Sequence, residues 1–272
     1  MKKILLVLIL FIATNSFAIL TTNPDSIRGS LRPERLCFDV TSYDLSINID
    51  PEKKMISGQN DIYFTVLENS KTIQIDLFRH FTVESIYLYA PIDSSGVEEE
   101  FPVEFKKIED ALFISFLDTI REGLSYRLKI AYSGYPNVAK KAPWDGGFVW
   151  DKDSMDRHFC GVACEGWGAS SWWPCKDHLY DEPDSMKLTF FVPEGYQCIS
   201  NGQLTDASQI KVNNKTYEKY SWKVTYPINT YNVSFYLGSY EKIQGWYVSG
   251  NDSLKTEFYA LDYNVDKAKS QF

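Results

Sequence analysis

The residues best suited to chemistry in this sequence lie between positions 158 and 184. This stretch contains a group of nitrogen and sulfur side chains, namely His158, Cys160, Cys164, Cys175 and His178. Such side chains are the usual ligands of zinc in proteins. Structural zinc sites normally combine a Cys-x(2-4)-Cys unit with a second paired unit, and the histidines here do not form one. We therefore predict no metal site and no catalytic residue in this stretch. We expect packed thiols, with a disulfide inside the cluster as the alternative.

The same stretch carries two further groups that could bind a ligand. If Trp167, Trp172 and Trp173 were exposed, they could stack on sugar rings, as in a carbohydrate-binding module. We expect them to be buried, because tryptophan is highly buried on average. A set of three nearby acids could bind calcium, but we expect a solvated acidic turn there: Asp181, Glu182 and Asp184.

The order of motifs in this stretch resembles the N-terminal domain of the M1 (gluzincin) zinc aminopeptidases. The resemblance rests on four strings, which are Ala163-Cys164-Glu165-Gly166, Trp173-Pro174-Cys175-Lys176-Asp177, the strand-like run from Asp184 to Pro193, and Ile199-Ser200-Asn201-Gly202. It departs from the commoner family pattern at Ala163, where a glutamine often stands, and in a longer segment after Asp177. The family's N-terminal domain is a saddle of β-sheets. The resemblance therefore implies an all-β fold.

The resemblance also implies a role for Glu165. In the family, the glutamate at this position binds the free α-ammonium group of the peptide substrate. A fixed carboxylate can distinguish a chain end from an internal amide through charge-assisted hydrogen bonds. Glu165 is thus the predicted substrate-binding residue, with peptide N-termini as the implied ligand.

The catalytic motifs of the family are missing from this sequence. Family members hold zinc through His-Glu-x-x-His, in which two histidines one helical turn apart face one metal. None of the three histidines, His80, His158 and His178, fits that motif. In the family the motif follows the region that this chain resembles. We therefore expect zinc in the complete family protein and none bound by this chain.

The N-terminus has the pattern of a secretory signal peptide. Lys2 and Lys3 precede an unbroken apolar run over residues 4–13, and the small residues Ser16 and Ala18 follow. The run is shorter than the roughly 20 residues that a membrane span needs. We predict cleavage after Ala18, a secreted or periplasmic protein, and no membrane span after signal removal.

Composition and charge exclude several classes of protein. Apolar residues make up 44% of the 272 positions and aromatic residues 15%, which is enough for a large core. The formal net charge of -8 argues against nucleic acid as a partner, because phosphate binding needs clustered Lys and Arg.

The elements that must position these residues are predicted to be strands. Apolar and polar residues alternate over 43–49, 62–66, 73–77, 112–116, 126–132, 186–192, 220–226 and 233–237. Many short strands of this kind indicate antiparallel sheets packed as a sandwich. Residues 134–184 show little periodicity and are predicted to form a long connection. A short helix is expected at the end of the chain, with Asn264 as its cap.

These observations give a domain division and two candidate functions. We expect a signal peptide over 1–18, an N-terminal extension over 19–35, the M1-type β domain over 36–260, and over 261–272 the start of a catalytic domain that the chain does not complete. The first function is the substrate-cleft domain of an exported zinc aminopeptidase. The alternative is a stand-alone secreted module that binds glycans or peptides.

Overall fold

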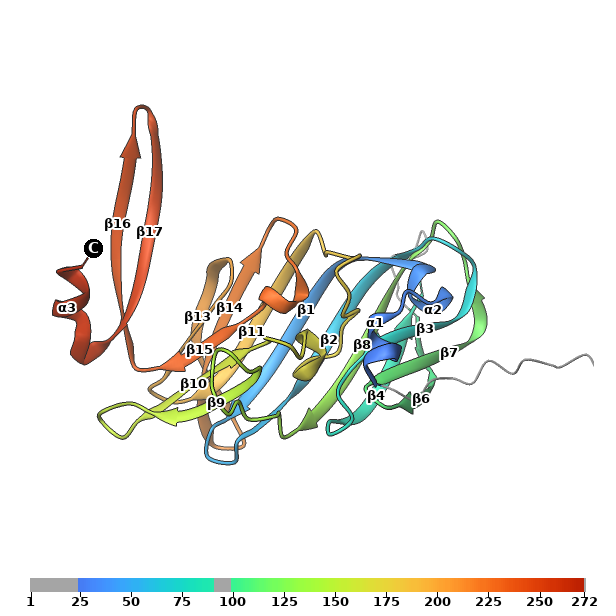
Figure 1. The fold of residues 1–272 in the computed structure, drawn as a ribbon, viewed down its shortest axis with the longest axis horizontal. Coiled ribbons are helices and arrows are strands. Elements are labelled where there is room, and N and C mark those ends of the chain that lie inside the picture. The colour runs from blue at the N-terminus through green and yellow to red at the C-terminus, as the bar shows by residue number, and fades with distance from the viewer. Residues whose placement is uncertain (1–23, 91–98, 272) are drawn as a thin grey trace, which may run out of the picture.

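The computed structural model describes residues 24–90 and 99–271, and the predicted signal peptide lies outside them. Most of the described chain forms strands, which belong to four sheets (Figure 1). Among the described residues, no helix combines the length and apolar character required to cross a membrane. The predicted all-β sandwich is confirmed, with one difference in strand direction that is described below.

An eight-stranded sheet runs through the middle of the molecule in the order β13-β14-β11-β1-β2-β8-β4-β5 (Figure 1). Its strands are β1 (Phe38–Asp50), β2 (Met55–Val66), β4 (Thr82–Tyr89), β5 (Glu100–Pro102), β8 (Ser125–Gly134), β11 (Ser185–Pro193), β13 (Gln203–Val212) and β14 (Lys215–Val224). β1 pairs with β2 in antiparallel fashion and with β11 in parallel. The sheet is therefore mixed, whereas the sequence had indicated only antiparallel pairing.

Three smaller sheets complete the β structure. A four-stranded sheet has the order β12-β15-β10-β9, a three-stranded sheet has the order β3-β7-β6, and β16 and β17 form a hairpin. Their strands are β3 (Ser70–Asp76), β6 (Glu104–Ile108), β7 (Ala111–Ile120), β9 (Gly147–Lys152), β10 (His158–Ala163), β12 (Gln197–Ser200), β15 (Phe235–Gly238), β16 (Tyr240–Ser249) and β17 (Asp252–Leu261).

The core follows from the alternation of side chains along the strands. In β1 a bulge between Val40 and Ser42 shifts the alternation by one residue, so that Val40 and Tyr43 both face inward. Buried side chains of the eight-, four- and three-stranded sheets form one continuous apolar cluster. Tyr132 of β8 lies in this cluster, and its hydroxyl donates to the Trp172 carbonyl (2.9 Å). The sheets therefore bury the segment around Trp172 between them.

The segment over 134–184 is more regular than its sequence indicates. It contains the antiparallel pair β9 and β10 and a 3₁₀ turn, η1 (Ala169–Ser171). The irregular residues next to Trp172 and Trp173 are buried, and these two tryptophans have no exposed surface, whereas residues 140–144 and 154–156 are exposed. The predicted long connection therefore contains a β9–β10 hairpin, which the sequence did not indicate. Its strands are short, and glycines and tryptophans obscure their alternation.

Helices are few and short in the described part of the chain. α1 (Pro24–Gly29) and α2 (Pro33–Leu36) precede β1, and α3 (Val265–Lys269) follows the β16–β17 hairpin through η3 (Asp262–Asn264). Asn264 occupies the N-cap position of α3 as predicted, but its side chain makes no capping hydrogen bond. Figure 1 shows the hairpin and α3 extending away from the body of the molecule.

A buried ion pair joins the irregular segment to β1. Lys176 and Asp181 are almost completely buried, and the Lys176 Nζ lies 2.5 Å from the Asp181 Oδ2. The ammonium group also donates to the Phe38 carbonyl (2.5 Å), and the carboxylate accepts from the Val40 amide (3.2 Å). The prediction of a solvated turn was therefore wrong for Asp181, because a lysine five positions earlier compensates its charge. Glu182 and Asp184 are exposed, as expected for such a turn.

Removal of the Asp181 charge tests the energetic importance of this pair. Asp181→Asn leaves the Lys176 ammonium buried without its counter-ion, and we expect a loss of about 3–5 kcal/mol in the free energy of unfolding. The double variant Lys176→Met, Asp181→Leu should lose much less, since no unpaired charge remains. Urea unfolding measures both, with Asp184→Asn as the exposed control. Equal midpoints for Asp181→Asn and Asp184→Asn would contradict a buried pair.

The cysteines give a second prediction. All five are free thiols; Cys37, Cys160, Cys175 and Cys198 are buried and Cys164 is partly buried. We expect DTNB to modify at most one thiol of the folded protein and five after unfolding without reductant. Three thiols after unfolding would reveal a disulfide.

Candidate functional site

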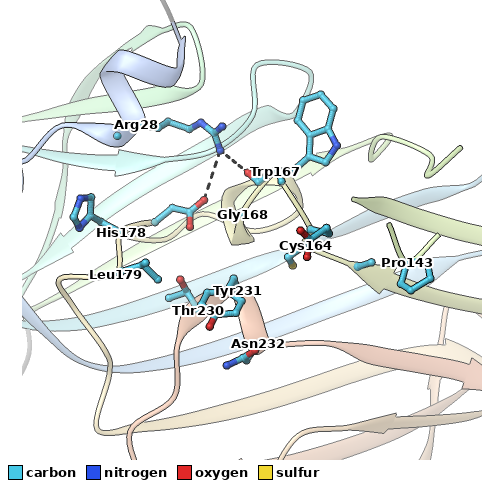
Figure 2. A pocket seen from close by; sticks show the side chains of 15 residues that line it. Arg28, Pro143, Cys164, Trp167, Gly168, His178, Leu179, Thr230, Tyr231 and Asn232 are labelled. Carbon is cyan, nitrogen blue, oxygen red and sulfur yellow. Dashed lines mark hydrogen bonds and ion pairs between the residues drawn. The ribbon is translucent and has the colours of Figure 1, made fainter. Parts of the chain in front are cut away.

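The candidate site is a pocket of about 780 Å³ on the surface of the domain. Its walls come from segments far apart in the sequence, namely the end of α1, the turn after β10, the residues after Asp177, and η2 (Thr230–Asn232). Figure 2 shows Arg28 and His178 toward one side of the pocket, Pro143 and Cys164 toward another, and Thr230, Tyr231 and Asn232 across from Trp167.

Glu165 lies in a tight turn at the end of β10. The Cys164 carbonyl accepts hydrogen bonds from the amides of Trp167 (3.1 Å) and Gly168 (2.9 Å), which closes the turn. Gly166 and Gly168 have φ values of 70° and 79°, a conformation that favours glycine. The turn therefore places the exposed Glu165 in the lining of the pocket.

Neighbouring segments pack closely against this turn. A Cβ atom at Gly146 would lie 2.4 Å from the Glu165 carbonyl oxygen and 2.4 Å from the Trp167 ring, so the chain before β9 needs glycine here. On the other side, the Asp177 carboxylate accepts from the amide (3.0 Å) and hydroxyl (2.6 Å) of Ser170 in η1. The chain before β9 and the segment that contains Asp177 thus lie on two sides of the Glu165 turn.

Glu165 differs from the other charged residues of the pocket. Asp177 pairs with Ser170 and with Arg28, whose Nη1 lies 3.7 Å from the Asp177 Oδ2. Burial, together with the nearby Arg35 guanidinium, lowers the pKa of His178, which favours its neutral form. Within residues 24–90 and 99–271, no group makes a hydrogen bond or ion pair with the Glu165 carboxylate. The pocket therefore offers a negative charge without an internal partner.

The nitrogen and sulfur side chains that the sequence groups between residues 158 and 178 are not gathered at one place in the described structure. His178 lines the Glu165 pocket, whereas His158 lies in β10, contacts Glu52 (2.9 Å) and lines a separate pocket of about 360 Å³. Among the described residues, no three His, Cys, Asp or Glu side chains are placed to hold an ion. Burial raises the pKa of Cys164 to about 11 and that of Cys160 to about 12, so both side chains are protonated thiols at neutral pH when no metal is bound. The zinc that the family implies does not fit this part of the chain.

The three tryptophans divide into two environments. Trp172 and Trp173 are buried as predicted, and Trp173 packs edge-on against Tyr43 with ring centroids 4.9 Å apart. Trp167 is 43% exposed and lines the pocket, so the expectation of burial was wrong for this residue. It follows the turn glycine Gly166, and the turn places it at the surface rather than beneath the segment.

Sequence reasoning missed two walls of the pocket. Arg28 lies in the stretch treated as an N-terminal extension, and no motif in that stretch indicated a role. Thr230, Tyr231 and Asn232 follow β14 in a stretch without periodicity, so only the fold brings them to the site. Asp177 belongs to one of the motif strings, but its partner Arg28 is almost 150 positions away in the sequence. The local sequence around either residue therefore does not indicate the pair.

Comparison with known proteins agrees with this architecture. The sequence model of the Peptidase M1 N-terminal domain matches residues 40–232. An M1 zinc metallopeptidase from Deinococcus radiodurans has a similar fold, with 18% identity, a TM-score of 0.62, and coverage of 82% of this chain and 47% of that chain. A point mutant of the Deinococcus protein bound to a Tyr-Ser-Ala substrate gives 19% identity, a TM-score of 0.65 and the same coverage.

The chain thus spans about half the length of these structures, and no curated protein matches it significantly. At this low identity the structural likeness supports the fold, while the family match covers more than half of the chain. This chain therefore belongs to the M1 peptidase family and contains that family's N-terminal domain.

Proposed function

We propose that this chain is the substrate-binding N-terminal domain of an exported M1-type zinc aminopeptidase, which removes amino acids from the N-termini of peptides. One observation carries the proposal, namely the exposed Glu165 carboxylate, which lines the large pocket and has no partner in the described part of the chain. The α-ammonium group of a peptide supplies the missing positive charge. Internal amides have no such charge, so this contact selects chain ends.

The composition of the pocket supports a cationic ligand. The Asp177 charge is compensated by Arg28, and His178 favours its neutral form, so Glu165 supplies the pocket's uncompensated charge. The exposed ring of Trp167 and the residues of η2 offer apolar and polar surface for the first side chain of the peptide. The pocket would thus orient a peptide by its amino end.

Bond cleavage on this proposal requires a second, zinc-binding domain. No group of side chains within the described ranges is placed to hold zinc, so on this proposal the chain contributes recognition, while the metal and the activated water come from the other domain. The part of the Deinococcus structures that this chain does not cover is long enough to include such a domain. Whether that domain is joined to this chain or encoded separately does not alter the role of Glu165.

The β16–β17 hairpin is the surface that we assign to this second domain. It lies beyond the family match, and a two-stranded sheet alone is at best marginally stable in water. Ile243, Tyr247 and Leu254 share one face of it, and the side chains of Tyr247 and Leu254 are 65% and 64% exposed. A second domain that covers this apolar face would stabilise the hairpin and would stand beside the substrate-binding domain.

One observation favours the alternative function, a stand-alone module for glycans or peptides. This observation is the exposed ring of Trp167. Trp172 and Trp173 have no exposed surface and cannot stack on a sugar ring. A module of this kind would bind peptides with free and blocked amino ends equally, because stacking does not depend on the terminal charge.

The Glu165 contact can be tested on the chain itself. We expect the protein to bind a short peptide amide with a free amino end more tightly than its N-acetylated form. Glu165→Gln should weaken binding of the free peptide about two- to fivefold, as for an exposed ion pair. Binding of the acetylated peptide should not change.

NMR titration measures these weak affinities. Glu182→Gln, an exposed acid outside the pocket, is the matched control and should behave as the wild type. Equal affinity of the wild-type protein for both peptides would contradict the proposed role and would support the stand-alone module.

The assignment of recognition to this chain and of zinc binding to a second domain gives another prediction. The 272-residue chain, with zinc added, should not release amino acids from anilide substrates. It can hold the amino end of a substrate, but equal binding of ground state and transition state does not accelerate the reaction. An assay with amino-acid anilides checks this, and release that a chelator abolishes would overturn it.

A further inference from the structure

The segment before the family match forms part of the pocket wall. α1 and α2 cover residues 24–36, whereas the family match begins at residue 40. Arg28 and Gly29 nevertheless line the pocket together with Glu165. The pocket therefore includes residues that lie outside the family match.

Arg28 reaches the far arm of the Glu165 turn. Its Nη1 donates to the Trp167 carbonyl (2.5 Å), and the same atom lies 3.7 Å from the Asp177 carboxylate. Figure 2 draws both contacts as dashed lines. The guanidinium also lies over the Phe78 ring, 4.8 Å from its centroid. Arg28 thus bridges the turn that carries Glu165 and the segment that follows Trp173.

Buried contacts fix the position of Arg28. Ile27 has no exposed surface, and its backbone carbonyl accepts a hydrogen bond from the side-chain amide of Gln74 (3.2 Å). Arg35 in α2 is completely buried, pairs with Asp76 of β3 and donates to the Arg28 carbonyl. The Asp76 carboxylate in turn accepts from the Asp177 amide (3.1 Å). The segment is therefore anchored to the sheet on both sides of Arg28.

We propose that Arg28 is a positioning residue, through which the N-terminal segment holds the Glu165 turn in the geometry that receives a peptide amino end. This inference rests on the proposed function of Glu165 and extends it. The Trp167 carbonyl is two residues from Glu165 in a turn closed by hydrogen bonds to one carbonyl, so movement at Trp167 moves the whole turn. A displaced carboxylate loses directional hydrogen bonds to the ligand.

The test compares two arginines of the same segment. Arg28→Met keeps an unbranched, flexible side chain over the first four atoms and removes the guanidinium. Arg32→Met is the matched control, because Arg32 does not line the pocket and its side chain makes no contact with the turn among the described residues. Circular dichroism establishes that both variants are folded.

The first readout is the reaction of Cys164 with DTNB at mildly alkaline pH. The Cys164 carbonyl closes the turn, so a looser turn exposes this thiol, and we expect Arg28→Met to accelerate its modification about tenfold, as for a local opening that becomes about 1.4 kcal/mol easier. The four buried thiols should stay unreactive. A purely structural role would instead destabilise the whole domain and expose several thiols together.

The second readout is the preference for free over acetylated peptide, with Glu165→Gln as the reference. Arg28→Met should reduce this preference in the same direction as Glu165→Gln, and Arg32→Met should not. If Glu165→Gln reduces the preference while Arg28→Met matches Arg32→Met in both readouts, the inference is overturned and the proposed function stands.

If Glu165→Gln has no effect, the proposed function fails, and with it the role of Arg28 in ligand binding. If Arg28→Met does not fold, Arg28→Gln takes its place, because glutamine retains a donor for the Trp167 carbonyl without the charge. The rate of Cys164 modification and the preference for free over acetylated peptide are then measured on that variant.

Discussion

The pairing of Asp76 with the segment that carries the pocket is the constraint on which the rest of the structure depends. Asp76 ends β3, and its backbone exchanges hydrogen bonds with Cys175 in both directions (2.8 and 3.1 Å). Its side chain is completely buried between Arg35 and the Asp177 amide. Burial raises the pKa of Asp76 to about 6 although Arg35 acts in the opposite direction. The cost of burying the Asp76 carboxylate is offset by its contacts, because this one side chain binds the N-terminal segment and the pocket segment to the three-stranded sheet.

Buried polar groups of this kind explain how an irregular segment can lie inside a β-sandwich. Backbone groups that are removed from water need partners, and residues 164–184 are not part of a continuous ladder that would supply them. The Asn60 side-chain amide donates to the Pro174 carbonyl and the Tyr132 hydroxyl to the Trp172 carbonyl, while the Lys176 ammonium of the segment in turn donates to the Phe38 carbonyl at the start of β1. Each donor comes from a strand or from the segment itself. The strands thus specify the path of the segment as well as the core beneath it.

The strands could be predicted from the sequence where one face of the strand is buried and the other is exposed to solvent. The alternation over 43–49 and 186–192 corresponds to β1 and β11, because inward positions must be apolar in a half-buried sheet. β16 gave no such signal, since most of its residues are exposed on both faces. Asp181 was placed in solvent, because a charged residue is normally exposed and its partner Lys176 is recognisable only in the fold. Glu165 was located through a motif, whereas Arg28 was found only through contacts that join distant parts of the chain.

The exposure of Glu165 limits what the isolated domain can achieve on the proposed function. An exposed ion pair contributes about 1 kcal/mol or less, because water screens the charges and competes for hydrogen bonds. The same pair becomes stronger when a neighbouring surface excludes water, since the effective dielectric constant falls. A second domain against the β16–β17 hairpin would provide such a surface if it also covers the pocket. On the proposed function, selection of amino ends would be strong only when both domains enclose the peptide, so the same contact would couple recognition to access to the zinc.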